Sequence, residues 1–119
     1  MKKILFIILM LVSINTFGQK KNILFEINKW EIRPSEELKL KEIINEYNYQ
    51  KDTIHVDGYA DKVTGTRKRN MFLSQKRAET VKDYLVKHGI DSTMIKVRNY
   101  GDTVFSFNTP EENRVEIYF

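Results

Sequence analysis

Apolar and polar residues alternate along four short segments, a pattern typical of β-strands that bury one face. In the first segment Ile23, Phe25 and Ile27 share one side, and Glu26 and Asn28 lie on the other. The four strands are expected at 22–28, 53–59, 95–100 and 114–119. The inward positions of the later strands are Ile54, Val56, Ile95, Val97, Val115, Ile117 and Phe119.

Two longer segments repeat apolar residues every three or four positions, which predicts amphipathic helices at about 35–49 and 67–88. The first follows Pro34 and carries Glu36 and Glu37 in its opening turn, where acids favour the helix dipole. The second ends before Gly89, a residue well suited to the position after a helix. The expected apolar stripes contain Leu40, Ile43, Ile44 and Tyr47 in the first helix and Leu73, Val81, Tyr84 and Leu85 in the second.

The order of these elements, β-α-β-α-β-β, predicts an α/β fold, a two-layer sandwich with both helices on one face of the sheet. The other face is expected to be polar, with Lys96, Arg98, Glu116 and Tyr118. Gly58 lies in register with the inward residues, so we expect another part of the chain to approach the backbone closely there.

Residues 1–18 have the pattern of a secretory signal peptide. Lys2 and Lys3 precede an apolar run at 4–12, and Gly18 precedes the expected cut. The run is shorter than the roughly 20 residues that span a bilayer; the alternative is a buried element of the domain. We therefore expect 19–119 to be a single domain, exported to the periplasm and associated with peptidoglycan or the outer membrane.

The charge and composition of the chain exclude several classes of partner and of chemistry. The net charge of +4 falls to about +2 without 1–18, which together with export argues against nucleic acid as a partner. The absence of cysteine excludes disulfides and lipid attachment at a cysteine after the leader, so we expect a soluble protein. His55 and His88 lack metal-ligand spacing, and no catalytic triad or carboxylate pair is evident. We therefore expect no cofactor, no metal and no enzyme activity.

Asp61 follows the second strand, and Asn70, Leu73, Ser74 and Arg77 share one face at the start of the second helix. Alone, Asp61 would be an ordinary turn acid and Arg77 a solvated helix residue. Together we expect them to face one shallow, partly exposed cleft. A carboxylate accepts from an ammonium and a guanidinium grips a carboxylate, so the pair could hold a small zwitterion.

The pattern G-x-x-D, a glycine-containing loop and N-x-x-L-S-x-x-R-A resembles the peptidoglycan-binding domain of the OmpA C-terminal family, which includes OmpA, MotB and Pal types. The resemblance implies that Asp61 binds the ammonium of the D-centre of diaminopimelate in the stem peptide, and that Arg77 binds its carboxylate. It also implies that Tyr59 and Ala60 line the site. Asn70 is expected to organise the loop by bonding to backbone groups, and Leu73 to pack in the core.

The chain departs from this family pattern in three places. The segment from Asp61 to Asn70 is one residue longer than is common, and Arg69 stands where an aromatic residue is usual. Near the C-terminus, 112–116 (ENRVE) keeps the second of two usual arginines. Residues 67–69 form a basic cluster beside the site, for which two interpretations stand. The cluster is either the solvated start of the helix or a surface that attracts the carboxylates of acidic glycan or of the stem peptide.

These observations predict an exported, non-enzymatic module that binds peptidoglycan non-covalently, with an envelope protein as a further partner. The alternative is an envelope assembly or interaction subunit whose glycan site has decayed and whose working surface is the polar sheet face.

Overall fold

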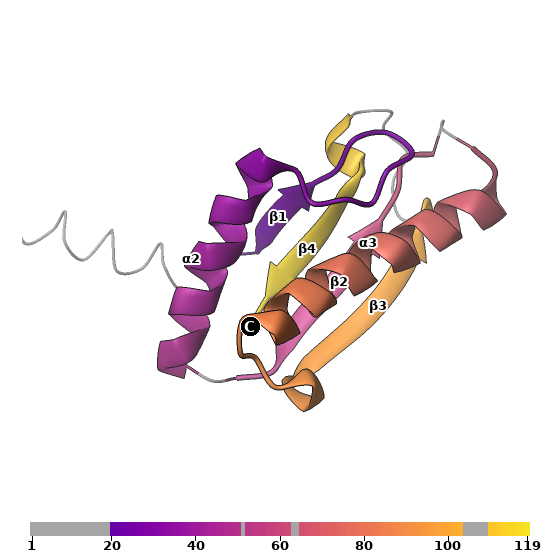
Figure 1. The fold of residues 1–119 in the computed structure, drawn as a ribbon. Helices are drawn as coiled ribbons and strands as arrows, with labels where there is room; N and C mark the ends of the chain where they lie inside the picture. The colour runs from indigo at the N-terminus through magenta and orange to yellow at the C-terminus, as the bar shows by residue number, and fades with distance from the viewer. Residues whose placement is uncertain (1–19, 51, 63–64, 104–109) are drawn as a thin grey trace, which may run out of the picture.

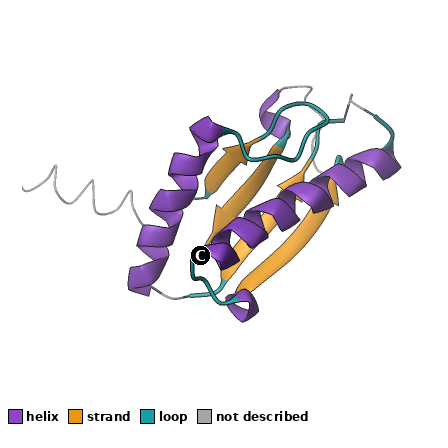
Figure 2. Cartoon of the chain, in the orientation of Figure 1, coloured by secondary structure: helices purple, strands orange, loops and turns teal. Residues whose placement is uncertain are grey.

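The computed structural model describes residues 20–50, 52–62, 65–103 and 110–119, so the expected signal peptide lies outside the described residues. One four-stranded sheet carries both described α-helices on the same face (Figures 1 and 2). In chain order the elements are β1 (Lys21–Leu24), α2 (Pro34–Gln50), β2 (Ile54–Tyr59), α3 (Arg67–Lys87), β3 (Ile95–Gly101) and β4 (Arg114–Tyr118), with short 3-10 turns at Ser92–Met94 and Pro110–Glu112. The predicted two-layer α/β sandwich and its element order are confirmed.

In this sheet, whose strand order is β1-β4-β2-β3, the ends of several strands lie together along one edge. β2 runs parallel to β3 and antiparallel to β4, and β1 runs antiparallel to β4. The ends of β1, β2 and β3 therefore meet the start of β4 at this edge. We call it the site edge, because the predicted functional residues lie there.

The core lies between the sheet and the two helices. The predicted inward residues of β2 and β4 are confirmed, since Ile54, Val56, Val115 and Ile117 are at most 1% exposed. The helices contribute Leu40, Ile43 and Tyr47 from α2 and Ala78, Val81 and Leu85 from α3 to the same buried cluster. Ile44, Tyr84, Val97 and Phe119 pack against it and are only partly buried.

Gly58 marks the place where α3 lies closest to the sheet. A Cβ atom there would stand 2.1 Å from the carbonyl oxygen of Ser74 and 3.2 Å from the Cβ of Ala78. The predicted close approach is therefore confirmed, and the approaching group is helix main chain. The missing side chain sets the depth at which α3 packs, and with it the position of Arg77 one turn after Ser74.

The first strand is shorter than predicted, and the prediction that Ile27 points inward is wrong. β1 ends at Leu24; Phe25 still enters the core, but Ile27 is 56% exposed. The chain turns away after Phe25, with the N–H of Lys29 donating to the carbonyl of Glu26 at 3.1 Å. It then forms a loop that contacts α3 through Arg77 and Phe72 before α2 begins (Figure 1).

The uncovered face of the sheet is polar, as predicted, and its side chains pack on one another. Tyr59 of β2 stacks on Tyr100 of β3, with ring centroids 5.1 Å apart, and the guanidinium of Arg114 lies 4.8 Å from the Tyr59 ring. His55 stacks on Tyr118 in the same way at 4.7 Å.

Within the part of the chain that the structure describes, no helix has the length and apolarity needed to cross a membrane.

Candidate functional site

Arg77 lies at the centre of the site edge and is completely buried, with 0% of its surface exposed. Its Nε donates to the carbonyl of Lys29 at 2.8 Å, and Nη2 donates to the carbonyl of Glu26 at 3.0 Å. Nη1 donates to the carbonyl of Tyr59 and to Oδ1 of Asn113, both at 3.0 Å. The predicted shallow, partly exposed position of Arg77 is therefore wrong, because the β1–α2 loop folds over the guanidinium and supplies acceptors to it.

The charge of Arg77 is stabilised by these acceptors in a place from which water is excluded. Burial lowers the pKa of the guanidinium to about 10, and the nearby carboxylate of Asp61 acts in the opposite direction. The ring of Phe25 adds a cation–π contact at 5.5 Å. The arginine is still protonated at neutral pH, and a buried charge of this kind is tolerated only when its donors are occupied.

Asn113, which immediately precedes β4, connects the two predicted ligand residues. Its Nδ2 donates to Oδ2 of Asp61 at 2.8 Å, and its Oδ1 accepts from the main-chain N–H of Asp61 at 3.2 Å. The same Oδ1 accepts from Arg77. Asn113 is 2% exposed and Asp61 is 6% exposed, so the predicted partial exposure is wrong for Asp61 as well. The amide has a fixed orientation, because its oxygen faces the cation and its nitrogen faces the acid.

Asn70 has a different partner from the predicted one. Its side-chain nitrogen donates to Oδ2 of Asp102 at 2.8 Å, so it bonds to a carboxylate after β3 rather than to backbone groups. Arg67 approaches the other oxygen of Asp102 at 3.7 Å. Ser74 supports the same turn, since its Oγ accepts from the N–H of Gly101 at 3.0 Å. Together these bonds fix the first turns of α3 to the end of β3.

The remaining predicted site residues are all buried. The carbonyl of Tyr59 contacts Arg77, but its ring lies on the uncovered sheet face. Ala60 is 1% exposed and donates its N–H to the carbonyl of Gly101 at 2.8 Å. Leu73 is 2% exposed, in line with its predicted place in the core. The structure thus places Tyr59 and Ala60 beside the site through their main chain.

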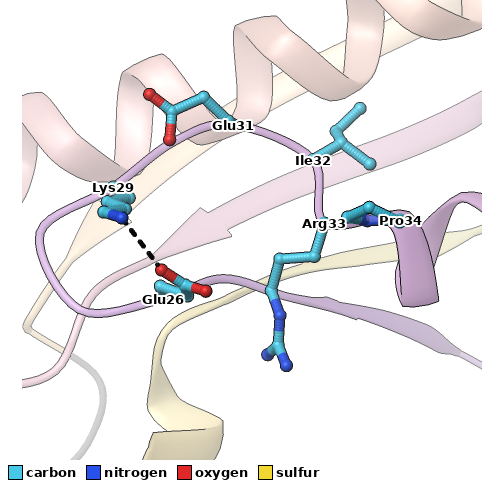
Figure 3. A pocket seen from close by; sticks show the side chains of 6 residues that line it. All are labelled: Glu26, Lys29, Glu31, Ile32, Arg33 and Pro34. Carbon is cyan, nitrogen blue, oxygen red and sulfur yellow. Dashed lines mark ion pairs between the residues drawn. The ribbon is translucent and has the colours of Figure 1, made fainter.

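A pocket of about 200 Å³ lies within the β1–α2 loop and was not predicted. Figure 3 shows its lining, which consists of Glu26, Lys29, Glu31, Ile32, Arg33 and Pro34. Glu26 and Lys29 form an ion pair at 3.1 Å, and the hydrogen bond and charge of Glu26 raise the pKa of Lys29. The carbonyls of these two residues hold Arg77 while their side chains line the pocket, so the loop joins the two features.

The sequence did not predict that two further residues, Asn113 and Asp102, belong to the site edge. Asn113 lies in the ENRVE segment, in which only one of the two arginines of the expected family pattern is present, and Asp102 follows the third strand without any periodic pattern. Among the residues that the structure describes, no group of three or more His, Cys, Asp or Glu side chains is arranged to hold a metal ion.

Comparisons with known proteins agree with this architecture. Residues 24–117 match the model of the OmpA family. Outer membrane protein A of Klebsiella aerogenes is 35% identical over 95 residues, covering 77% of this chain and 27% of that protein. The corresponding protein of Citrobacter freundii is 33% identical over 95 residues, covering 77% of this chain and 40% of its own length. The chain thus spans well under half of these relatives.

Solved structures with the same fold include the OmpA-like domain of FopA1 from Francisella tularensis, with a TM-score of 0.76 and 25% identity over 84% of this chain and 70% of that one. The C-terminal domain of MotB from Helicobacter pylori has a TM-score of 0.70 and 25% identity over 82% of both chains. The peptidoglycan-associated lipoprotein of Burkholderia pseudomallei shares the fold, with a TM-score of 0.72 and 18% identity over 82% of this chain and 88% of that one.

The fold and the site together define the class of domain. It is an α/β sandwich in which an acid and an arginine are connected at one edge of the sheet. The chain belongs to the OmpA family.

Proposed function

We propose that this chain is an exported, non-enzymatic domain that binds peptidoglycan non-covalently through the diamino acid of the stem peptide. The observation that carries the proposal is the buried connection Asp61–Asn113–Arg77 at the site edge. It brings a carboxylate and a guanidinium together in a chain of the OmpA family. Membership of that family, with outer membrane proteins as relatives, supports a place in the cell envelope.

Asp61 provides the half of the site that takes the ammonium group. Asn113 holds one carboxylate oxygen at 2.8 Å and the main-chain N–H of Asp61 at 3.2 Å, so the direction of the acid is set before a ligand arrives. Preorganisation of this kind reduces the entropy lost on binding. The ligand group that fits is the ammonium at the D-centre of diaminopimelate.

Arg77 provides the half of the site that binds the ligand carboxylate. To bind it, the guanidinium exchanges its present hydrogen-bond acceptors for the carboxylate oxygens of the ligand. In the closed form its Nε and Nη2 bond to the carbonyls of Lys29 and Glu26, which are neutral. A ligand carboxylate would replace them when the β1–α2 loop moves. The bonds to the two carbonyls are already charge-assisted by the guanidinium, and a ligand carboxylate would add the opposite charge and a bidentate geometry, so the exchange favours the bound form.

The occupied guanidinium also favours a second candidate function. If the loop stays closed, Arg77 serves only to hold the fold together. The chain is then an envelope assembly or interaction subunit without a working peptidoglycan site. In that case the polar, stacked outer face of the sheet is the surface that meets the partner.

Sedimentation with purified sacculi separates the two functions. The wild-type protein should pellet with sacculi, and Asp61→Asn, which removes the charge but keeps the shape, should bind about tenfold more weakly or worse. The matched control is Asp83→Asn, an exposed acid on α3, which should bind like wild type. No soluble muropeptides should be released. If wild type stays in the supernatant, or folded Asp61→Asn pellets like wild type, the peptidoglycan proposal is wrong.

A further inference from the structure

Phe72 is an aromatic residue on the solvent side of α3, and cations surround it. Its side chain is 39% exposed, and Lys68 and Lys76 lie one helical turn before and after it. The guanidinium of Arg69 lies 5.2 Å from the ring centroid, and Nζ of Lys76 lies 5.6 Å from it. The ring is thus part of the outer surface and lies among three positive charges.

Trp30 joins this group from the β1–α2 loop. Its ring meets Phe72 edge to face at 5.9 Å, and the guanidinium of Arg69 lies 5.9 Å from the Trp30 ring. We call the set Trp30, Lys68, Arg69, Phe72 and Lys76 the aromatic–cation patch. It contains none of the residues of the Asp61–Asn113–Arg77 connection.

The patch is held in place by a hydrogen bond to the loop. Oδ1 of Asn28 accepts from Nε of Arg69 at 3.2 Å and from its Nη2 at 3.1 Å. Asn28 has φ of 60°, in the left-handed region, which asparagine adopts more readily than most other non-glycine residues. The guanidinium is therefore positioned before any partner is present.

The charge of the patch is positive. Among the ion pairs of the described residues, Lys76 has an acidic partner, Glu79, at 3.8 Å, whereas Lys68 and Arg69 have none. Lys68 is exposed, and Arg69 and Lys76 are partly exposed. Solvent-accessible cations beside aromatic rings match the composition of a protein surface that lies at the boundary of a bilayer. There the rings lie among the headgroups, and lysine and arginine contact anionic phosphates.

A sugar is a poorer match for this surface. Sugars stack on an open aromatic face, but Arg69 and Lys76 lie over the Phe72 ring, and Arg69 lies over the Trp30 ring as well. We propose that the aromatic–cation patch binds the surface of a bilayer that contains anionic phospholipid. This interaction is separate from the proposed binding of peptidoglycan, because neither Asp61 nor Arg77 takes part in it.

Co-sedimentation with vesicles tests the proposal. The purified protein should bind vesicles of phosphatidylethanolamine and phosphatidylglycerol, bind vesicles of phosphatidylcholine much more weakly, and dissociate as salt is raised. Phe72→Ser should weaken binding about fivefold, because the ring no longer enters the interface. The double variant Lys68→Glu, Lys76→Glu should weaken it by more than about 25-fold, since each cation near an anionic surface contributes about 1 kcal/mol, or about fivefold.

Matched controls identify effects of the patch alone. Val86→Ser changes a side chain that is 40% exposed on the same helix but outside the patch, and Lys41→Glu reverses an exposed charge on α2. Val86→Ser should bind vesicles like wild type, and Lys41→Glu should lose far less than the double variant. Asp61→Asn should also keep vesicle binding, which separates this proposal from the peptidoglycan site.

Three outcomes would overturn the proposal. The first is equal binding to anionic and zwitterionic vesicles, and the second is wild-type binding by folded Phe72→Ser. The third is loss of sacculus binding by the patch variants with vesicle binding unchanged, which would assign the patch to peptidoglycan. Circular dichroism of each variant shows whether it is folded.

Discussion

Oδ1 of Asn113 accepts a hydrogen bond from Nη1 of Arg77 at 3.0 Å, although the two residues are 36 positions apart in the chain. The same amide bonds twice to Asp61. One small side chain thus sets the relative positions of β2, α3 and β4 at the site edge. The stability of the fold and the geometry of the candidate site therefore depend on the same contacts.

Replacing Asn113 should consequently be costly. Asn113→Leu keeps the size of the side chain but removes the bonds to Asp61 and Arg77, and leaves buried charged and polar groups without these partners. We expect a loss of at least about 3 kcal/mol in the free energy of unfolding, measured by urea titration. Asn22→Leu, an exposed position on β1, is the control and should change stability by under about 0.5 kcal/mol. Equal effects in the two variants would show that the Asn113 bonds are not formed.

Gly58→Ala should separate α3 from the sheet. The new methyl group would meet the Ser74 carbonyl at 2.1 Å, so the helix must shift, at about 3 kcal/mol or more. Gly89→Ala is the matched control, because its Cβ meets nothing within 4 Å and the substitution suffers only from its φ of +101°. That strain amounts to about 1–2 kcal/mol. A Gly58→Ala protein that is as stable as Gly89→Ala would contradict the close packing of α3.

Leu85→Ala tests the placement of the buried face of α3. Leu85 is 0% exposed, and its truncation should lower the free energy of unfolding by about 2–5 kcal/mol. The adjacent Val86 is 40% exposed, and Val86→Ala should lower it by under about 0.5 kcal/mol. Thermal or chemical unfolding of both variants gives the comparison, and similar losses would mean that the helix is rotated from the position described.

Glu36 should make the stability of the domain fall in acid. Burial raises the pKa of its carboxyl, but the hydrogen bond from the N–H of Leu24 at 2.8 Å and the contact with Lys39 at 3.0 Å outweigh burial, so the pKa is below its usual 4.5. A depressed pKa stabilises the fold above the unfolded value, and this contribution is lost as the pH falls through the folded value.

The measurement is the difference in free energy of unfolding between wild type and Glu36→Gln at several pH values. We expect about 1.5–3 kcal/mol at pH 7, decreasing steadily below about pH 4.5. Glu42→Gln, at an exposed position of α2, is the control and should show little difference at any pH. A constant difference for Glu36→Gln between neutral and acid pH would contradict the ionised hydrogen bond.

The fold was predictable because its burial is periodic. Val56 and Ile117 alternate with polar neighbours along their strands, and Val81 and Leu85 recur one helical turn apart, so each pattern identifies its element without knowledge of the rest. Gly58 was predictable for a related reason, since a glycine at an inward position leaves space that another element can use.

The interior of the site was not predictable in the same way. The burial of Arg77 depends on carbonyls 48 and 51 positions earlier in the chain, and Asn70 bonds to a residue 32 positions later. No local pattern records such contacts. The turn of the β1–α2 loop was hidden as well, because Ile27 continues the alternation of the strand although the chain has already left the sheet.

The central claim, that Asp61 and Arg77 bind the two charged ends of a stem-peptide diamino acid, is tested most directly by calorimetric titration with two stem peptides. One contains diaminopimelate, and the other contains lysine, which keeps an ammonium but lacks the carboxylate for Arg77. Wild type should bind the first peptide at least about tenfold more tightly than the second, since charge-assisted hydrogen bonds of about 1.5–3 kcal/mol are lost. Equal affinity for the two peptides, or binding to neither, would contradict the account.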